Sequence, residues 1–248
     1  MTPSIPAELI ERLSRAQRVV AMTGAGISAE SGIPTFRDAQ SGLWAQFKPE
    51  ELASEAGFRA APERVWQWYR WRYQQVRKTS PNPGHYALAQ LQQRLPNFTL
   101  ITQNVDGLHQ AAGSTDVIEL HGSIRRVRCL DNDCEEQEWP ENSTGTPPKH
   151  SCGSLLRPAV VWFGELLPEQ ALADAIEAVE NCDLMFSIGT SSLVYPAAEL
   201  PLVAQQNGAV VVEINPNPTP LSTRADYVLT GAAGVVLPEL VKALPGPV

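Results

Sequence analysis

The sequence predicts an α/β fold built on a doubly wound parallel sheet, with a smaller lobe that is helical and contains cysteines. Short apolar strands alternate with helical segments along most of the chain, which is the order that a parallel sheet requires. A glycine-rich turn follows the first strand, and polar residues follow several later strands. Residues 123–157 interrupt this alternation and hold three of the four cysteines, so we interpret them as an inserted module.

The composition limits the class of protein. The 248 residues suffice for a sizeable core, and 43% hydrophobic with 19% charged residues is typical of a soluble globular protein. No apolar run approaches the roughly 20 residues of a membrane span, and no signal or transit pattern is visible, so we expect a cytoplasmic protein without a membrane partner. The net charge of −8 argues against nucleic acid as the main partner, because phosphate binding needs clustered cations. We expect a monomer.

Periodicity and turn residues place the expected elements along the chain. Helices are expected at residues 7–16, 49–56, 62–78, 84–95, 169–180 and 196–207. Strands are expected at residues 18–23, 98–102, 117–120, 184–188, 210–214 and 227–229. Ligands of such sheets bind at the carboxyl ends of the strands. We therefore expect one site, formed by the motifs that follow residues 23, 102, 120, 188 and 214.

The first strand leads directly into a glycine-rich turn with the sequence Gly24-Ala25-Gly26-Ile27-Ser28-Ala29. It fits the G-x-G-x-x-G/A pattern that carries a pyrophosphate in Rossmann-like folds. Gly24 permits a tight turn, Gly26 lets the backbone approach a phosphate, and free N–H groups at the helix start would face the anion. Small-residue turns also serve packing alone, so this match by itself leaves both alternatives open.

The residues after this turn do not fit a dehydrogenase. A dinucleotide dehydrogenase should carry an acidic residue about 20 residues further on, at the end of a second strand. That position falls near Trp44, and no strand with a terminal acid precedes it. The turn instead runs into residues 31–38, where Phe36 and Arg37 are placed to reach over a bound nucleotide. The sequence therefore disfavours hydride transfer.

Further motifs follow in order along the chain: Gly32-Ile33-Pro34-Thr35-Phe36-Arg37, Thr102-Gln103-Asn104-Val105-Asp106-Gly107-Leu108-His109, His121-Gly122, Val161-Trp162-Phe163-Gly164-Glu165, Gly189-Thr190-Ser191 and Asn215. Together with the glycine turn, they resemble the sirtuins, a family of NAD-dependent protein-lysine deacylases. The resemblance extends from about residue 15 to about residue 240. It implies NAD as the cofactor and acyl-lysine proteins as the partners.

His121 follows a strand directly, at the same edge as the other motifs. An isolated histidine there is more often a hydrogen-bonded structural residue. The resemblance makes His121 the general base, which suits an unperturbed pKa of about 6.5, and it adds Asn104 as a second catalytic residue. In the implied reaction the acyl oxygen attacks the ribose carbon that holds nicotinamide, and an alkylimidate remains. His121 then takes a proton from the ribose hydroxyls, and the products are lysine, nicotinamide and O-acyl-ADP-ribose.

The resemblance also implies which residues bind NAD. Asp106 would contact the nicotinamide carboxamide, Gln103 and Asn104 would lie near its ribose, and Ala233 would lie near the adenine. His109 is on the same segment, but a satisfied polar contact or a helix start explains it better. The expected cofactor-binding residues are Gly24, Ala25, Gly26, Ser28, Phe36, Arg37, Gln103, Asn104, Asp106, Gly189, Thr190, Ser191, Asn215, Asn217 and Ala233.

Two segments resemble the edges between which sirtuins hold an extended substrate peptide, through main-chain pairing that tolerates many sequences. Phe163 could also simply be a core residue, and the two interpretations are compatible. The expected peptide-binding residues are Val161, Phe163, Gly164 and Glu165 on one edge, with Leu193 and Tyr195 on the other.

The expected helix at residues 62–78 carries Tyr69 and Arg72, which share a face because they are three residues apart. The pair matches the Tyr-x-x-Arg of the sirtuin subgroup that removes succinyl, malonyl and glutaryl groups. A guanidinium can pair bidentately with the distal carboxylate, and a phenol adds one hydrogen bond. Ala53 matches the small residue that leaves room for a longer acyl chain. The alternative is a surface arginine on a helix whose aromatic residues pack a small lobe, namely Trp66, Trp68, Trp71 and Tyr73.

Without an export signal, cysteines indicate thiols or metal ligands rather than disulfides. Cys129 and Cys134 form one acceptable pair of zinc ligands, and Cys152 matches the last ligand of a second pair. The expected partner of that second pair is replaced by Lys149. Either His150 substitutes at an unusual spacing, or a water or other group completes the shell, or the site holds no zinc. The remaining cysteine, Cys182, is expected to be a buried packing residue.

Two other functions could use the same site. One is a non-catalytic module that binds NAD or ADP-ribose, for which a general base has no evident use. The other is a mono-ADP-ribosyltransferase. For the domains, we assign residues 1–35, 80–122 and 159–248 to a Rossmann-like NAD-binding domain, 36–79 to the helical part of the small lobe, and 123–158 to a zinc-ribbon-like cysteine module.

Overall fold

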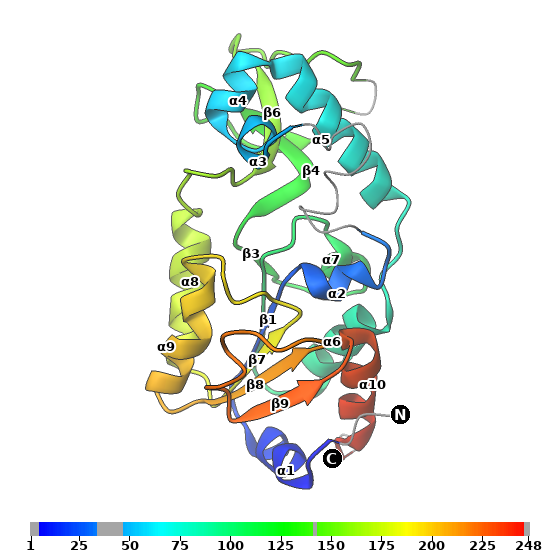
Figure 1. Cartoon of the computed structure of the whole chain (residues 1–248), viewed down its shortest axis with the longest axis vertical. Helices are drawn as coiled ribbons and strands as arrows, with labels where there is room; N and C mark the ends of the chain where they lie inside the picture. Colours follow the sequence, from blue (N-terminus) through cyan, green and yellow to red (C-terminus); the bar gives the residue numbers. More distant parts are fainter. Residues whose placement is uncertain (1–4, 34–46, 141–142, 246–248) are drawn as a thin grey trace.

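The computed structural model describes residues 5–33, 47–140 and 143–245. The chain forms a larger lobe, which contains both ends of the described chain, and a smaller lobe above it (Figure 1). Among the described residues, no helix is both long and apolar enough to cross a membrane.

The larger lobe contains a six-stranded sheet in the order β3-β2-β1-β7-β8-β9, and every neighbouring pair is parallel. Chain order reverses between β1 and β7, and a reversal of this kind creates a crevice at the carboxyl ends of the strands. The predicted doubly wound parallel sheet is confirmed. The strands are β1 (Val19–Thr23), β2 (Phe98–Thr102), β3 (Ile118–Glu119), β7 (Leu184–Ile188), β8 (Val210–Asn215) and β9 (Tyr227–Thr230).

The register of the central strands brings their loops together. Thr23 at the end of β1 pairs with Thr102 of β2 on one side and with Ile188 of β7 on the other. The hydroxyl of Thr23 also donates to that of Thr102 over 2.8 Å. The polar loops that follow these three strands therefore leave the sheet side by side.

Helices cover both faces of this sheet (Figure 1). Alternation along β1 sends Ala21 into one core, with the helices α1, α6 and α10, and Met22 into the other, with α8 and α9. Each core buries apolar area that stabilises the lobe at about 25 cal/mol per Å². The helices are α1 (Ala7–Arg15), α6 (Pro83–Arg94), α8 (Glu169–Glu180), α9 (Leu200–Gln206) and α10 (Ala233–Ala243).

The smaller lobe packs three helices against a three-stranded antiparallel sheet in the order β5-β4-β6. Its core is aromatic: Trp66 and Trp68 are fully buried, and Trp66 stacks on Trp139 with ring centroids 4.5 Å apart. The expected aromatic small lobe is therefore present. Its elements are α3 (Pro49–Leu52), α4 (Glu55–Ala60), α5 (Pro62–Arg77), β4 (Gly122–Cys129), β5 (Gln137–Glu138) and β6 (Leu156–Val160).

Several expected elements differ in the structure. The helix expected at residues 49–56 is two helices, because Ala53 leaves helical geometry (φ −134°) and the Ser54 hydroxyl accepts a hydrogen bond from the Gly57 N–H, which starts α4. The segment 196–207 begins with a 3₁₀ turn, Ala197–Glu199, before α9. The sequence patterns did not predict α10 or the strands of the cysteine module. The domain boundaries drawn from the sequence stay a prediction. Two further short helices in the described part of the chain are α2 (Ala25–Ala29) and α7 (Leu108–Ala111).

Candidate active site

A cavity of about 650 Å³ lies at the carboxyl ends of β1 and β2 and takes its walls from both lobes. The larger lobe contributes the turn after β1 and the loop after β2. The smaller lobe contributes α5, and residues 161–167, which follow β6, form a further part of the wall. This is the position at which a doubly wound sheet binds its ligands.

Three glycines bring the turn after β1 against the turn after β7. A Cβ on Gly26 would lie 2.7 Å from the Cα of Gly189, and one on Gly24 would lie 2.9 Å from the Gly189 oxygen. The Gly26 N–H donates to the main-chain oxygen of Gly189 over 2.8 Å, and the Gly24 N–H donates to the main-chain oxygen of Ile188 over 3.0 Å. The expectation of free N–H groups that face an anion is therefore wrong for these two amides, because the last residue of β7 and the turn after it accept both hydrogen bonds.

A buried chain of hydrogen bonds ties the loop after β2 to the glycine turn. The Asn104 amide donates to the Gly24 oxygen and to the Ser28 hydroxyl, each over 3.0 Å. Ser28 in turn donates to Asp106 over 2.7 Å, and the other oxygen of Asp106 accepts from the Leu108 N–H over 2.9 Å. Asn104, Ser28 and Asp106 are buried but still line the cavity. They therefore present polar atoms whose positions are fixed.

His121 also lines the cavity, beside the loop after β2. Its Nδ1 lies 2.9 Å from the main-chain oxygen of Gln103. A carbonyl oxygen only accepts hydrogen bonds, so Nδ1 carries the proton, and Nε2 of the neutral ring is left as the basic atom. Burial lowers the pKa of His121, although the bond to Gln103 opposes this shift. The imidazole is therefore neutral near pH 7 and fixed in the tautomer that a general base requires.

His109 has a different environment. It is buried, with Nε2 2.8 Å from the Thr23 hydroxyl and its ring 5.0 Å from that of His85. Burial lowers the pKa of His109 to about 3, so its ring is neutral. Nε2 is therefore satisfied, as the sequence favoured, whereas the buried Nδ1 has no hydrogen-bond partner among the described residues.

The residues expected to hold the ADP-ribose half lie around the ends of β7 and β8. The Asn215 side chain donates to the main-chain oxygen of Thr190 over 2.7 Å, which links the two loops. Ala233 is buried at the start of α10, whereas Ser191 and Asn217 are exposed in the loops. These residues share one edge of the sheet with the glycine turn. Two further expected cofactor residues lie outside the described part of the chain: Phe36 and Arg37.

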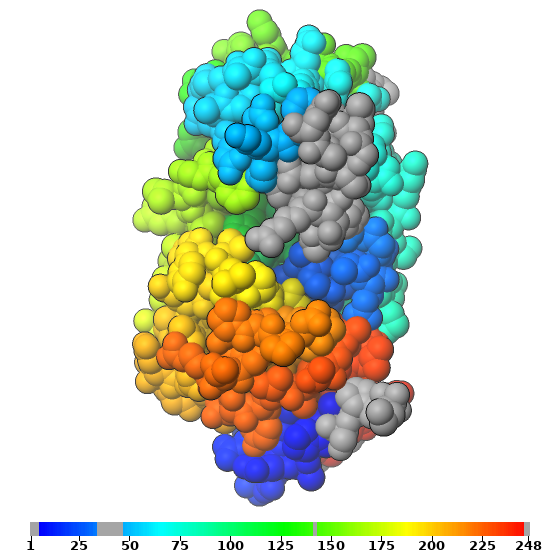
Figure 2. Space-filling view, in the orientation of Figure 1, coloured from blue at the N-terminus to red at the C-terminus, as the bar shows by residue number. Residues whose placement is uncertain are grey.

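Large apolar side chains are exposed on the two segments expected to bind a peptide. Phe163 is 57% exposed, Leu193 59% and Tyr195 68%. Phe163 and Tyr195 line the cavity. Figure 2 shows the yellow-green and yellow surfaces of these segments next to one another. Phe163 is therefore a surface residue of the cavity and not part of the core.

In the segment 161–165, main-chain N–H groups already form hydrogen bonds within the protein. The Val161 N–H donates to the oxygen of His121, and the Phe163 N–H donates to the oxygen of Ala53, each over 2.9 Å. A peptide strand beside this segment would therefore have to use its carbonyl groups or the amide of Gly164.

Tyr69 and Arg72 face the cavity from α5, and Ala53 faces it from the break between α3 and α4. The Arg72 guanidinium carbon lies 4.9 Å from the ring centroid of Trp68 and 5.9 Å from that of Tyr69. Burial raises the pKa of Tyr69 to about 12 and lowers the pKa of Arg72. The wall thus offers a protonated phenol and a partly dehydrated cation, which together match a carboxylate.

Arg157 lies in β6, is 2% exposed and was not among the residues predicted from the sequence. Its guanidinium forms an ion pair with Glu165, and its Cζ lies 3.3 Å from the ring centroid of Trp162. Glu165, expected to bind substrate, also accepts from the Trp162 N–H over 2.8 Å and from Arg128 over 3.2 Å. A sequence signal existed, since a charged residue inside the buried strand Leu156–Val160 needs a partner.

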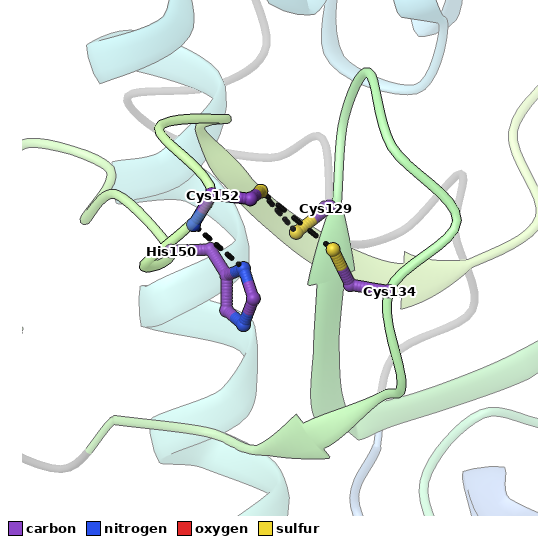
Figure 3. A group of neighbouring side chains, drawn as sticks. All are labelled: Cys129, Cys134, His150 and Cys152. Atoms are coloured by element: carbon purple, nitrogen blue, oxygen red, sulfur yellow. Dashed lines mark hydrogen bonds between the residues drawn. The ribbon is translucent and has the colours of Figure 1, made fainter.

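Cys129, Cys134, His150 and Cys152 converge in the smaller lobe (Figure 3), with their possible ligand atoms within 4.8 Å of one another. The sulfur of Cys152 lies 3.7 Å from that of Cys129 and 3.6 Å from that of Cys134. Tetrahedral zinc with Zn–S bonds of about 2.3 Å separates two sulfurs by about 3.8 Å. The four residues therefore fit zinc, and His150 lies where it could supply the fourth ligand that the sequence left open.

Lys149 takes no part in this cluster. It forms an isolated β-bridge with Leu155 instead. Cys182 lies in the other lobe, buried, with its thiol 3.3 Å from the oxygen of Val179. This agrees with the packing role expected for it.

The fold and the cavity define a nucleotide-binding α/β protein with a fixed, neutral histidine at the junction of a Rossmann-like lobe and a smaller cysteine-containing lobe. The sequence model of the Sir2 family matches residues 24–196. The chain belongs to the Sir2 family, which confirms the resemblance to sirtuins.

Known relatives match nearly the whole chain. It is 54% identical over 209 residues to the NAD-dependent protein deacylase of Aquifex aeolicus, a match that covers 84% of this chain and 87% of the relative. It is 50% identical over 247 residues to the NAD-dependent protein deacylase of Methylococcus capsulatus, with 96% of each chain covered. A solved structure of a Sir2 homolog–NAD complex has a TM-score of 0.90 and 48% identity, and the match covers 97% of this chain and 94% of that one.

Proposed function

We propose that this protein is an NAD-dependent protein-lysine deacylase that removes succinyl, malonyl or glutaryl groups in preference to acetyl. The products are nicotinamide, free lysine and O-acyl-ADP-ribose. The deacylase activity is the one named for the Aquifex and Methylococcus relatives. The acyl preference rests on Tyr69 and Arg72 in the wall of the cavity.

His121 supports the catalytic part of the proposal. The hydrogen bond from Nδ1 to the Gln103 oxygen keeps the ring proton on Nδ1, so Nε2 retains its lone pair. Because His121 lines the cavity, Nε2 can take a proton from a ribose hydroxyl. Asn104 and Asp106 are held by Ser28 and can orient the nicotinamide end of the cofactor. NAD supplies the ribose carbon that receives the acyl oxygen, and zinc at the cysteine cluster would serve the fold of the smaller lobe.

The position of Arg72 in the wall of the cavity is the single observation on which the proposed acyl preference rests. An acetyl group ends in a methyl, which gains nothing from a cation. A succinyl group ends in a carboxylate, which can accept from the guanidinium and from the phenol of Tyr69. Because burial has removed part of the hydration of Arg72, an anionic partner is favoured at this point.

The first experiment measures nicotinamide release with NAD and a panel of acetyl-, succinyl-, malonyl- and glutaryl-lysine peptides. We expect release that depends on the acyl peptide and is fastest with the acidic groups. His121→Ala should abolish the formation of O-acyl-ADP-ribose and free lysine, because in the proposed order the base acts after nicotinamide has left. Nicotinamide release that ignores the peptide, or an ADP-ribose mass added to a protein, would instead favour the ADP-ribosyltransferase, and no release at all would favour a binding module.

The second experiment tests the acyl preference with Arg72→Met. A hydrogen bond to a charged group contributes about 1.5–3 kcal/mol, so the ratio of desuccinylation to deacetylation should fall by at least about tenfold. Arg70→Met is the matched control, because Arg70 lies on the same helix but is not among the residues that line the cavity. An unchanged ratio in Arg72→Met would overturn the preference for acidic groups.

A further inference from the structure

Trp162 connects the segment after β6 to the acyl-binding wall on α5. Its indole Nε1 donates to the phenol oxygen of Tyr69 over 2.9 Å, although the two residues are 93 positions apart. Both side chains are 2% exposed, so water does not compete for this bond. Both residues also line the cavity.

The direction of this hydrogen bond is fixed by chemistry. An indole N–H can only donate, so the phenol oxygen of Tyr69 is the acceptor, and its own proton remains for a different partner. Burial raises the pKa of Tyr69 to about 12, so the phenol keeps this proton at neutral pH. With the acceptor side occupied by Trp162, the hydroxyl is set to act as a donor toward the cavity.

Trp162 is itself held in place from two sides. Its main-chain N–H donates to Glu165 over 2.8 Å, and the guanidinium of Arg157 lies over its indole ring, 3.3 Å from the centroid. Arg157 is anchored in turn by its ion pair with Glu165 and by a 2.8 Å bond to the oxygen of Val160. The indole therefore has little freedom to turn away from Tyr69.

We infer that Trp162 is a positioning residue that selects for acyl groups with a terminal carboxylate. It occupies the acceptor side of the Tyr69 oxygen and so directs the hydroxyl proton at a carboxylate oxygen. Arg157 and Glu165 maintain this arrangement. The inference rests on the proposed preference for acidic acyl groups, and it assigns part of that preference to a residue that need not contact the carboxylate itself.

The test is Trp162→Phe, which removes the indole donor and keeps an aromatic ring. We expect KM for the succinyl-lysine peptide to rise about three- to tenfold, with kcat and the acetyl-lysine KM within about twofold of wild type. Trp66→Phe is the matched control: it removes an equally buried indole of the same lobe, whose N–H goes to the Thr144 oxygen and not to Tyr69. Equal changes in both KM values for Trp162→Phe would overturn the inference.

A double-mutant cycle shows whether Trp162 acts through Tyr69. If it does, Trp162→Phe should have almost no further effect on the succinyl KM in a Tyr69→Phe background. Additive effects would mean that Trp162 acts on its own, against the inference. Should Trp162→Phe fail to fold, Arg157→Lys carries the same test, since it keeps the indole and removes the planar group over it.

Arg72→Met separates this inference from the proposed function. If Arg72→Met and Tyr69→Phe lower the succinyl preference while Trp162→Phe and Arg157→Lys do not, only the role of Trp162 is overturned. If Arg72→Met leaves the preference unchanged, the acidic-acyl function fails and the inference fails with it.

Discussion

The Nδ1 atom of His121 lies 2.9 Å from the main-chain oxygen of Gln103, the first residue after β2. This contact fixes the tautomer of the ring and joins it to the loop that holds Asn104. The base and the amide that would lie beside the ribose therefore keep a constant relative position.

The pH dependence of deacylation should follow the protonation of His121. Because burial lowers the pKa of this ring, the neutral base persists below the usual value of about 6.5. We expect kcat/KM to rise with pH through the lowered pKa and to be level by about pH 7. A pH–rate profile checks this. His121→Asn should lower kcat/KM at least about a hundredfold, and it should also remove the fall of kcat/KM at acidic pH. An acid limb centred above pH 7 would contradict the assignment.

The size of the residue at position 53 should set the acyl length. Ala53 is 4% exposed and lines the cavity, so Ala53→Leu would place a larger side chain in the space that we propose for the acyl chain. We expect glutaryl activity to fall most, then succinyl activity, and acetyl activity least. Rates across the acyl panel check this order. An equal loss for all groups would show that Ala53 does not border the acyl chain.

One zinc ion per chain is expected at the cysteine cluster, with His150 as the fourth ligand. His150→Ala should weaken zinc binding by more than about tenfold, whereas His150→Cys should retain it. Metal analysis and chelator competition on protein without a polyhistidine tag measure both. Lys149→Ala is the control, since Lys149 lies next in the chain but outside the cluster. Full zinc affinity in His150→Ala would exclude His150 as a ligand.

Gly189 should tolerate no side chain. It has φ +60°, and a Cβ would lie 2.6 Å from the Ile27 nitrogen, in the glycine turn. Gly189→Ala would add a steric clash to the strain of a side chain at positive φ. The clash should lower the free energy of unfolding by about 1–3 kcal/mol beyond that strain, and it should weaken NAD binding. Gly208→Ala is the control, because Gly208 has φ +92° and nothing within 4 Å of its Cβ position. Thermal unfolding and NAD titration of both variants check the difference, and equal effects would contradict it.

Much of the fold could be predicted because the signals were local. The apolar strands and the glycine turn gave the parallel sheet, and the helix periodicity of residues 62–78 placed Tyr69 and Arg72 on one face. The small-lobe strands β4 and β6 were missed because Arg126, Arg128 and Arg157 interrupt their apolar pattern. The break at Ala53 was missed because the Ser54 cap competes with a continuous helix.

The sequence by itself determined the doubly wound sheet, the edge at which the polar loops gather, and the residue types of the Sir2 family. Only the tertiary structure decided the partners of those residues: the Gly24 and Gly26 amides on the turn after β7, His150 among three thiols, Arg157 over Trp162, and Trp162 on Tyr69. The physical reason is that periodicity records which side of an element is buried but does not identify the partner of a side chain. That partner depends on how separate segments pack, as in the hydrogen bond between Trp162 and Tyr69, which are 93 positions apart.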